Sequence, residues 1–174
     1  MSPLRRLLLI SLAVLPLAAC VTEPAPAPPP VAPRVTPTQA LTAVMSAGKS
    51  DDRELSVQPL IDPQIQDLRD TADAAKARAD WSGAADALNQ ALLLSPEDPT
   101  LLQERAEVAL ALGEWERAET LARKALDLGS KTGPLCRRHW ATIEQSQLAR
   151  GEDQNAASAH AQIASCTVAG FDRM

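Results

Sequence analysis

Aromatic residues are scarce in this chain, which has no tyrosine, one phenylalanine and three tryptophans among 174 residues. Strands draw heavily on aromatic and β-branched side chains, so a sheet-rich fold would lack its usual formers. Alanine and leucine dominate instead, and both favour helices. The composition therefore predicts an all-α protein.

Positive charge is also in short supply. The formal net charge is -5, and no run of basic residues occurs anywhere in the sequence. Removal of residues 1–19, for the reason given below, deletes Arg5 and Arg6 but no acidic residue, which leaves the remainder at -7. Nucleic-acid binding needs a cationic surface for the phosphates, so this class of partner is not expected.

Catalytic signatures are missing. The sequence contains no G-x-S-x-G, H-E-x-x-H, P-loop or G-x-G-x-x-G pattern, and His139 and His160 are its only histidines. His139 follows two arginines on a predicted helix and is expected at the surface. We therefore predict no enzyme activity, no catalytic residue, no metal site and no cofactor other than a covalent lipid.

The N-terminus has the order of a secretion signal. Arg5 and Arg6 precede an apolar run over residues 7–15, which is too short to span a bilayer. Leu17-Ala18-Ala19-Cys20 then resembles the bacterial lipobox, which implies that residues 1–19 are removed and that the thiol of Cys20 is acylated. Several acyl chains on one residue would anchor the chain stably to a membrane. An ordinary signal with a chance cysteine is the alternative.

Two linkers are predicted between Cys20 and the first long helix, over residues 20–63. Seven of the fourteen residues from Pro24 to Pro37 are proline, which is typical of a disordered, polyproline-like tether rather than of a core. Residues 38–47 have helical composition, but ten residues alone are too few for a stable helix in water. This segment is expected to dock on the rest of the chain or on a partner, if it folds.

The rest of the chain repeats itself. Asp80-Trp81-Ser82-Gly83-Ala84 is echoed by Glu114-Trp115-Glu116-Arg117-Ala118, and the two tryptophans are 34 residues apart. A period of this length indicates helical hairpins. The pattern resembles the tetratricopeptide repeat family, which implies a short solenoid of about three antiparallel hairpins over residues 64–170. The repeats are expected at about 65–98, 99–132 and 135–166.

Helix boundaries follow from proline and glycine. Asp62-Pro63 and Asp98-Pro99 are predicted to start the first helix of repeats one and two, and Gly129 is predicted to end the second repeat with a positive φ. Alanines at Ala72, Ala84, Ala106 and Ala118 should let paired helices approach closely, because a larger side chain would overpack the contact. The third repeat fits the pattern less well.

Two cysteines remain once Cys20 is assigned to lipid. Cys136 and Cys166 each lie fifteen residues from Gly151, the predicted turn of the last hairpin. Equal distances from the turn place two residues side by side in an antiparallel helix pair. We predict a disulfide between them, which an oxidising compartment permits; two buried free thiols are the alternative.

A binding groove is also expected from the resemblance. In the tetratricopeptide family the first helices of the repeats line a concave face that receives a protein or peptide. Carried over by register, the groove would contain Gln66, Arg69, Asp73, Lys76, Gln103, Glu107, Arg138 and Gln145. These residues are mixed in charge and mostly polar, and a plain solvated face is the alternative.

The sequence thus predicts a lipid-anchored scaffold or adaptor in a cell-envelope complex. Val21, rather than aspartate, follows Cys20, which by resemblance implies the outer membrane, with the chain facing the periplasm. The function could be a pilotin-type factor for pilus or secretin assembly, or a regulator of peptidoglycan synthesis. A different class of function is the alternative: a structural envelope lipoprotein that associates weakly with itself.

Overall fold

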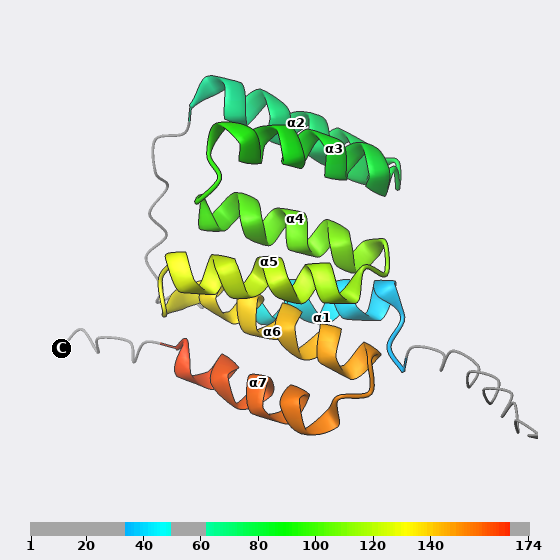
Figure 1. The fold of residues 1–174 in the computed structure, drawn as a ribbon, viewed down its shortest axis with the longest axis vertical. Helices are drawn as coiled ribbons and strands as arrows, with labels where there is room; N and C mark the ends of the chain where they lie inside the picture. Colours follow the sequence, from blue (N-terminus) through cyan, green and yellow to red (C-terminus); the bar gives the residue numbers. More distant parts are fainter. Residues whose placement is uncertain (1–33, 50–61, 168–174) are drawn as a thin grey trace, which may run out of the picture. The chain divides into compact units, whose positions relative to one another are not determined.

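The computed structural model describes residues 34–49 and 62–167, all of which belong to one unit of the chain, Ala32–Met174. These residues form helices and no strands, so the predicted all-α class is confirmed (Figure 1). The predicted signal peptide, Cys20 and most of the two linkers lie outside the described residues. The helices are α1 (Pro37–Ala47), α2 (Pro63–Ala77), α3 (Trp81–Leu94), α4 (Pro99–Ala111), α5 (Trp115–Leu128), α6 (Gly133–Ala149) and α7 (Asp153–Ser165).

Three antiparallel hairpins follow one another as predicted, formed by α2 with α3, α4 with α5, and α6 with α7. Trp81 and Trp115 occupy matching positions as the first residues of α3 and α5. Asp62 and Asp98 cap α2 and α4 by accepting backbone N–H groups, and a proline follows each of them. The repeated sequence pattern therefore corresponds to a repeated start of each helix.

Alanine forms the contacts between the helices. Ala72, Ala84, Ala106 and Ala118 are all completely buried. Around them the larger core residues are few, and Leu88, Leu101 and Leu110 are among the largest that are fully buried. Small residues at these positions allow close helix packing, which is the role that the sequence predicts for them.

The turns inside the three hairpins share one geometry. The N–H groups of Asp80, Glu114 and Glu152 each donate to a carbonyl five residues earlier, at 2.9 to 3.0 Å. This bond closes the end of a helix when the residue before it adopts a left-handed conformation. Gly113 and Gly151 take that position with φ of 73° and 77°, but in the first hairpin the position belongs to Ala79, with φ of 56°.

The prediction for Gly129 was wrong. Its φ is -92° and its ψ is -177°, so it is extended and not left-handed. A Cβ atom there would lie 2.9 Å from the carbonyl oxygen of Ala125 and 3.1 Å from the Cβ of Pro99. Glycine is suited to this position because neighbouring atoms leave little room for a Cβ atom, and not because the backbone is left-handed.

The last hairpin is tied at its open end. Cys136 near the start of α6 and Cys166 after α7 form a disulfide with a Cα–Cα distance of 5.7 Å. Beside it, the backbone N–H of Gly133 donates to the carbonyl of Cys166 at 2.7 Å. On α7 only Ala156 and Ala159 are buried, so this helix ends the stack with most of its surface in solvent.

The short helix that was expected between the two linkers is present as α1, and it belongs to the packed helices. Thr36 and Gln39 form a reciprocal capping box at its start, and Ala40 and Val44 are completely buried. α1 packs against α6 and α4 rather than against its neighbour in sequence, α2. An isolated helix of this length is marginal, so tertiary contacts stabilise it.

Candidate functional site

α1 covers much of the surface that was predicted to be the binding groove. It packs on α4 and α6, the first helices of the second and third hairpins, and Val44 shares one apolar cluster with Leu110 and Ala141. The guanidinium of Arg137 donates to the carbonyl oxygens of Ala47 and Lys49, at 2.9 and 3.0 Å. At the other end of α1, Arg34 pairs with Asp153 at 2.6 Å. The chain therefore fills part of its own predicted groove.

Three of the predicted groove residues, Gln103, Glu107 and Gln145, are at most 8 % exposed. Gln103 donates to Glu107 at 2.9 Å and to Thr142 at 2.8 Å, and Arg138 donates to Glu107 at 2.7 Å. The first contact lies within α4, and the other two join α4 to α6. The polar residues of the second and third hairpins are thus internal connections, not the open surface that the repeat register predicts.

His139 belongs to the same buried network, whereas the sequence predicted it at the surface. Its side chain is completely buried, and its Nδ1 lies 2.7 Å from Oε1 of Gln103. Because Oε1 is an acceptor, Nδ1 must carry the proton. Burial, together with the positive charges of Arg138 and Lys131, lowers the pKa of His139 to about 4, so the ring is neutral at pH 7.

The predicted groove residues of the first hairpin remain in contact with solvent. Arg69 forms a two-point pair with Glu104 of α4, with Nε to Oε2 at 3.0 Å, and this pairing raises the pKa of the guanidinium. Asp73 and Lys76 form an exposed ion pair at 2.8 Å. Gln66 lies half-buried one turn before Asp70, to which it donates at 2.7 Å. This part of the predicted groove is free of α1.

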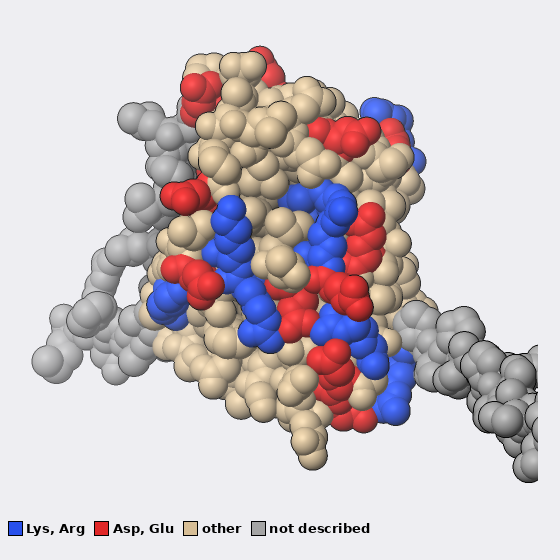
Figure 2. Space-filling model, in the orientation of Figure 1, with Lys and Arg blue, Asp and Glu red and all other residues tan. Residues whose placement is uncertain are grey.

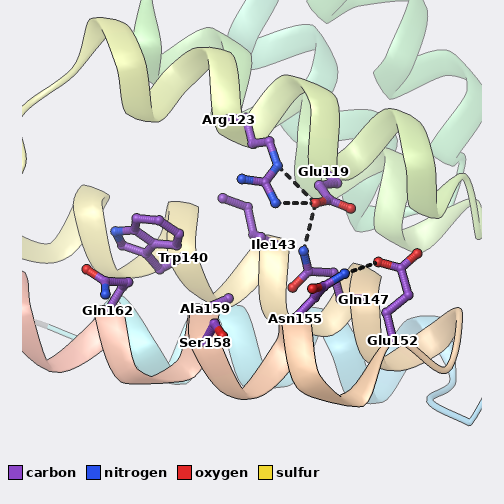
Figure 3. Close-up of a pocket in the computed structure, with 10 residues that line it drawn as sticks. All are labelled: Glu119, Arg123, Trp140, Ile143, Gln147, Glu152, Asn155, Ser158, Ala159 and Gln162. Carbon is purple, nitrogen blue, oxygen red and sulfur yellow. Dashed lines mark hydrogen bonds and ion pairs between the residues drawn. The ribbon is translucent and has the colours of Figure 1, made fainter.

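A second hollow, which the sequence did not predict, lies between α5 and α7. We call it the α5–α7 cleft; α6 forms its floor, and its volume is about 400 Å³ (Figure 3). An adjoining hollow of about 450 Å³ shares Arg123, Trp140 and Gln162 with it. The residues that line the α5–α7 cleft are Glu119, Arg123, Trp140, Ile143, Gln147, Glu152, Asn155, Ser158, Ala159 and Gln162.

The charges of the α5–α7 cleft neutralise one another. Glu119 accepts from Arg123 at 2.9 Å and also from Arg150, and although burial opposes it, these bonds hold the pKa of Glu119 below its ordinary value. Arg150 also donates to Glu152 at 2.8 Å, which lowers the pKa of that carboxyl. Figure 2 shows basic and acidic side chains interspersed over this face, without a large patch of one sign.

One amide in the α5–α7 cleft has an unpaired oxygen. Gln147 is 3 % exposed, and its Nε2 donates to Glu119 at 2.9 Å. A carboxylate can only accept, so this bond fixes the orientation of the amide and directs Oε1 to the other side. That oxygen is buried and has no partner in the structure, and a buried polar atom without a hydrogen bond is unfavourable.

Nothing in the described residues is arranged for metal chemistry. No group of three or more histidine, cysteine and acidic side chains within residues 34–49 and 62–167 could hold a metal ion. His160 lies 3.0 Å from Glu144 on the exposed side of α7. None of the helices in this part of the chain has the length and apolar character needed to cross a membrane. The exposed side of the predicted groove on α2 and the α5–α7 cleft can bind a ligand or a partner through shape and hydrogen bonding.

Comparison with solved structures identifies a similar domain. The globular C-terminal domain of LpoP from P. aeruginosa superposes with a TM-score of 0.57 and 28 % sequence identity, over 60 % of this chain and 99 % of that one. No family model matches the chain, and no curated protein sequence matches it. The tetratricopeptide pattern therefore stays a resemblance, while the similarity to the LpoP domain extends over nearly all of that domain.

Proposed function

We propose that this chain is a lipid-anchored regulator of peptidoglycan synthesis, which faces the periplasm and acts by binding a peptidoglycan synthase. The observation that carries the proposal is the similarity to the C-terminal domain of LpoP, at 28 % identity over nearly the whole of that domain. Among the functions that the sequence raised, a regulator of peptidoglycan synthesis is the one that this similarity favours.

The N-terminal sequence supports the same proposal. A basic head, an apolar run and Leu17-Ala18-Ala19-Cys20 resemble a lipoprotein signal, and acylation of Cys20 would place the helices beside the outer membrane. Metabolic labelling with palmitate, followed by membrane fractionation, tests this. The label and the outer-membrane location should both be lost on Cys20→Ser, while Cys136→Ser should keep the label.

The surface we propose for the synthase is the side of α2 that faces the predicted groove. Gln66, Arg69, Asp73 and Lys76 follow one another along this side, and the polar contacts of Gln66 and Asp73 are to Asp70 and Lys76 of the same helix. Arg138 is unsuitable for a test, because a glutamate there would face the buried carboxylate of Glu107. Asp73 is exposed and Gln66 is half-buried, and neither is bonded to another helix by an ion pair or hydrogen bond, so changes at both should have little effect on folding.

The test measures binding to a purified bifunctional peptidoglycan synthase of the same cell, together with its rate of glycan polymerisation. The chain should bind and change the rate, and Gln66→Arg with Asp73→Arg should weaken binding by tenfold or more (about 1.4 kcal/mol). Asp67→Arg with Ala74→Arg is the matched control, on the outer side of the same helix, and should bind like the unaltered chain. Lack of any binding or rate effect by the unaltered chain would overturn the proposed function.

A further inference from the structure

The α5–α7 cleft lies on a different side of the stack from the α2 surface, and the proposed function does not use it. Its walls come from α5 and α7, and α6 forms the floor with Trp140, Ile143 and Gln147 (Figure 3). The cleft combines one partly buried indole with three amide side chains, those of Gln147, Asn155 and Gln162. Concave sites with a few convergent polar groups beside an aromatic ring are typical of small-molecule binding.

We infer that the α5–α7 cleft binds an oligosaccharide of N-acetylated amino sugars. A sugar ring presents C–H groups on its faces and hydroxyl groups at its edges. Here the indole of Trp140 can contact a ring face, while Asn155, Ser158 and Gln162 of α7 lie along one wall to pair with hydroxyls. A side-chain amide both donates and accepts hydrogen bonds, and so does each hydroxyl group of a sugar, so the two can pair in either direction.

The unpaired oxygen of Gln147 indicates the N-acetyl group. This oxygen needs a donor, and the N–H of an acetamido group is one. The partly exposed ring of Trp140, together with Ala159, offers an apolar contact for the acetamido methyl group. Pairing the oxygen with a ligand would remove the unfavourable burial of an unsatisfied polar atom.

The charges favour a neutral ligand over a charged one. Glu119 is bonded to Arg123 and Arg150, and Glu152 to Arg150 and Asn155. A charged peptide would find no unpaired opposite charge among these groups. A helix or an apolar peptide would need a row of apolar anchors, whereas the cleft offers mainly Trp140, Ile143 and Ala159. A saccharide fits this lining better than a peptide.

The experiment follows the amide resonances of the ¹⁵N-labelled, full chain during titration with a β-1,4-linked tetramer of N-acetylglucosamine. Shifts should concentrate on α5, α6 and α7, and the fluorescence of Trp140 should change. Cellotetraose, which lacks acetamido groups, should bind more weakly, and a neutral peptide of similar mass should not bind the cleft. No synthase is present, so the result is independent of the proposed synthase binding.

Two variants make the test specific. Asn155→Ala with Gln162→Ala removes two exposed amides of the cleft, and we expect affinity to fall by about tenfold or more. Gln90→Ala with Gln154→Ala removes two exposed amides that do not line the cleft and should leave affinity unchanged. Absence of shifts with the tetramer at millimolar concentration, shifts confined to α2 or α4, or stronger binding of the peptide would each overturn the inference.

Discussion

Arg137 of α6 donates through Nε to the carbonyl oxygen of Ala47, ninety residues earlier, at 2.9 Å. Carbonyls at the end of a helix lack partners within the helix, and here a side chain from another helix supplies one. The same guanidinium reaches the carbonyl of Lys49. The end of α1 is thus fixed by the third hairpin, which makes α1 part of the folded domain.

Val44→Ala should therefore destabilise the whole domain. Val44 is completely buried between α1 and the helices beneath it, and loss of its two methyl groups should lower the free energy of unfolding by about 2 kcal/mol. Met45→Ala, at a neighbouring residue of α1 that is 53 % exposed, should change it by less than about 0.5 kcal/mol. Denaturant unfolding checks both, and equal effects would mean that α1 is not docked in solution.

Reduction of the Cys136–Cys166 disulfide should weaken the domain. The bond closes a segment of the chain with a sequence separation of 30, and a loop of this size is expected to contribute roughly 3–4 kcal/mol by constraining the unfolded chain. Thermal unfolding with and without a thiol reductant measures the loss. The double variant Cys136→Ser, Cys166→Ser should start from the lower stability and show no response to reductant.

The free energy of unfolding should decrease as the pH is lowered, because His139 is buried in its neutral form. Its folded pKa of about 4 lies below the ordinary 6.5, so the unfolded chain binds the proton more readily between these values. The free energy of unfolding should be fully retained well above pH 6.5, where neither state binds the proton, and should fall by about 2 kcal/mol between pH 7 and pH 5. His139→Gln should flatten this dependence, and Gln154→Ala, at an exposed residue that does not titrate, should leave it unchanged. Parallel pH profiles for all three proteins would contradict the prediction.

Ala79→Gly should stabilise the first hairpin. Ala79 has a φ of 56°, a conformation that glycine occupies in the other two hairpin turns. Relief of the left-handed strain is worth about 1–2 kcal/mol, partly offset by the greater freedom of glycine in the unfolded chain, so a net gain of about 0.5–1 kcal/mol is expected. Ala74→Gly, at an exposed position within α2, should instead cost about 1 kcal/mol. Chemical denaturation decides the sign of each change.

The hairpins could be predicted because each one repeats a local signal. Pro63 and Pro99 start helices, and Trp81 and Trp115 occupy the same position in consecutive hairpins. Such features depend on a few neighbouring residues, which the sequence displays directly.

The functional surfaces were harder to predict, because they depend on contacts between distant segments. The docking of α1 brings Val44 into one apolar cluster with Leu110 and Ala141. No spacing of residues in the sequence predicts this contact. Gln103 and Glu107, which were expected to line an open groove, are buried in the structure. The α5–α7 cleft was missed for the same reason. The sequence shows Trp140 and Gln147 but not the separation of the two helices above them.

The two ends of α1 are held near opposite ends of α6. Arg34 pairs with Asp153, the first residue of α7, just beyond the end of α6, and Arg137 near the start of α6 donates to Ala47. The two helices are therefore antiparallel, and tension applied to the chain before residue 34 would act along α1 as shear. Helices loaded in this way must slide past each other before they separate.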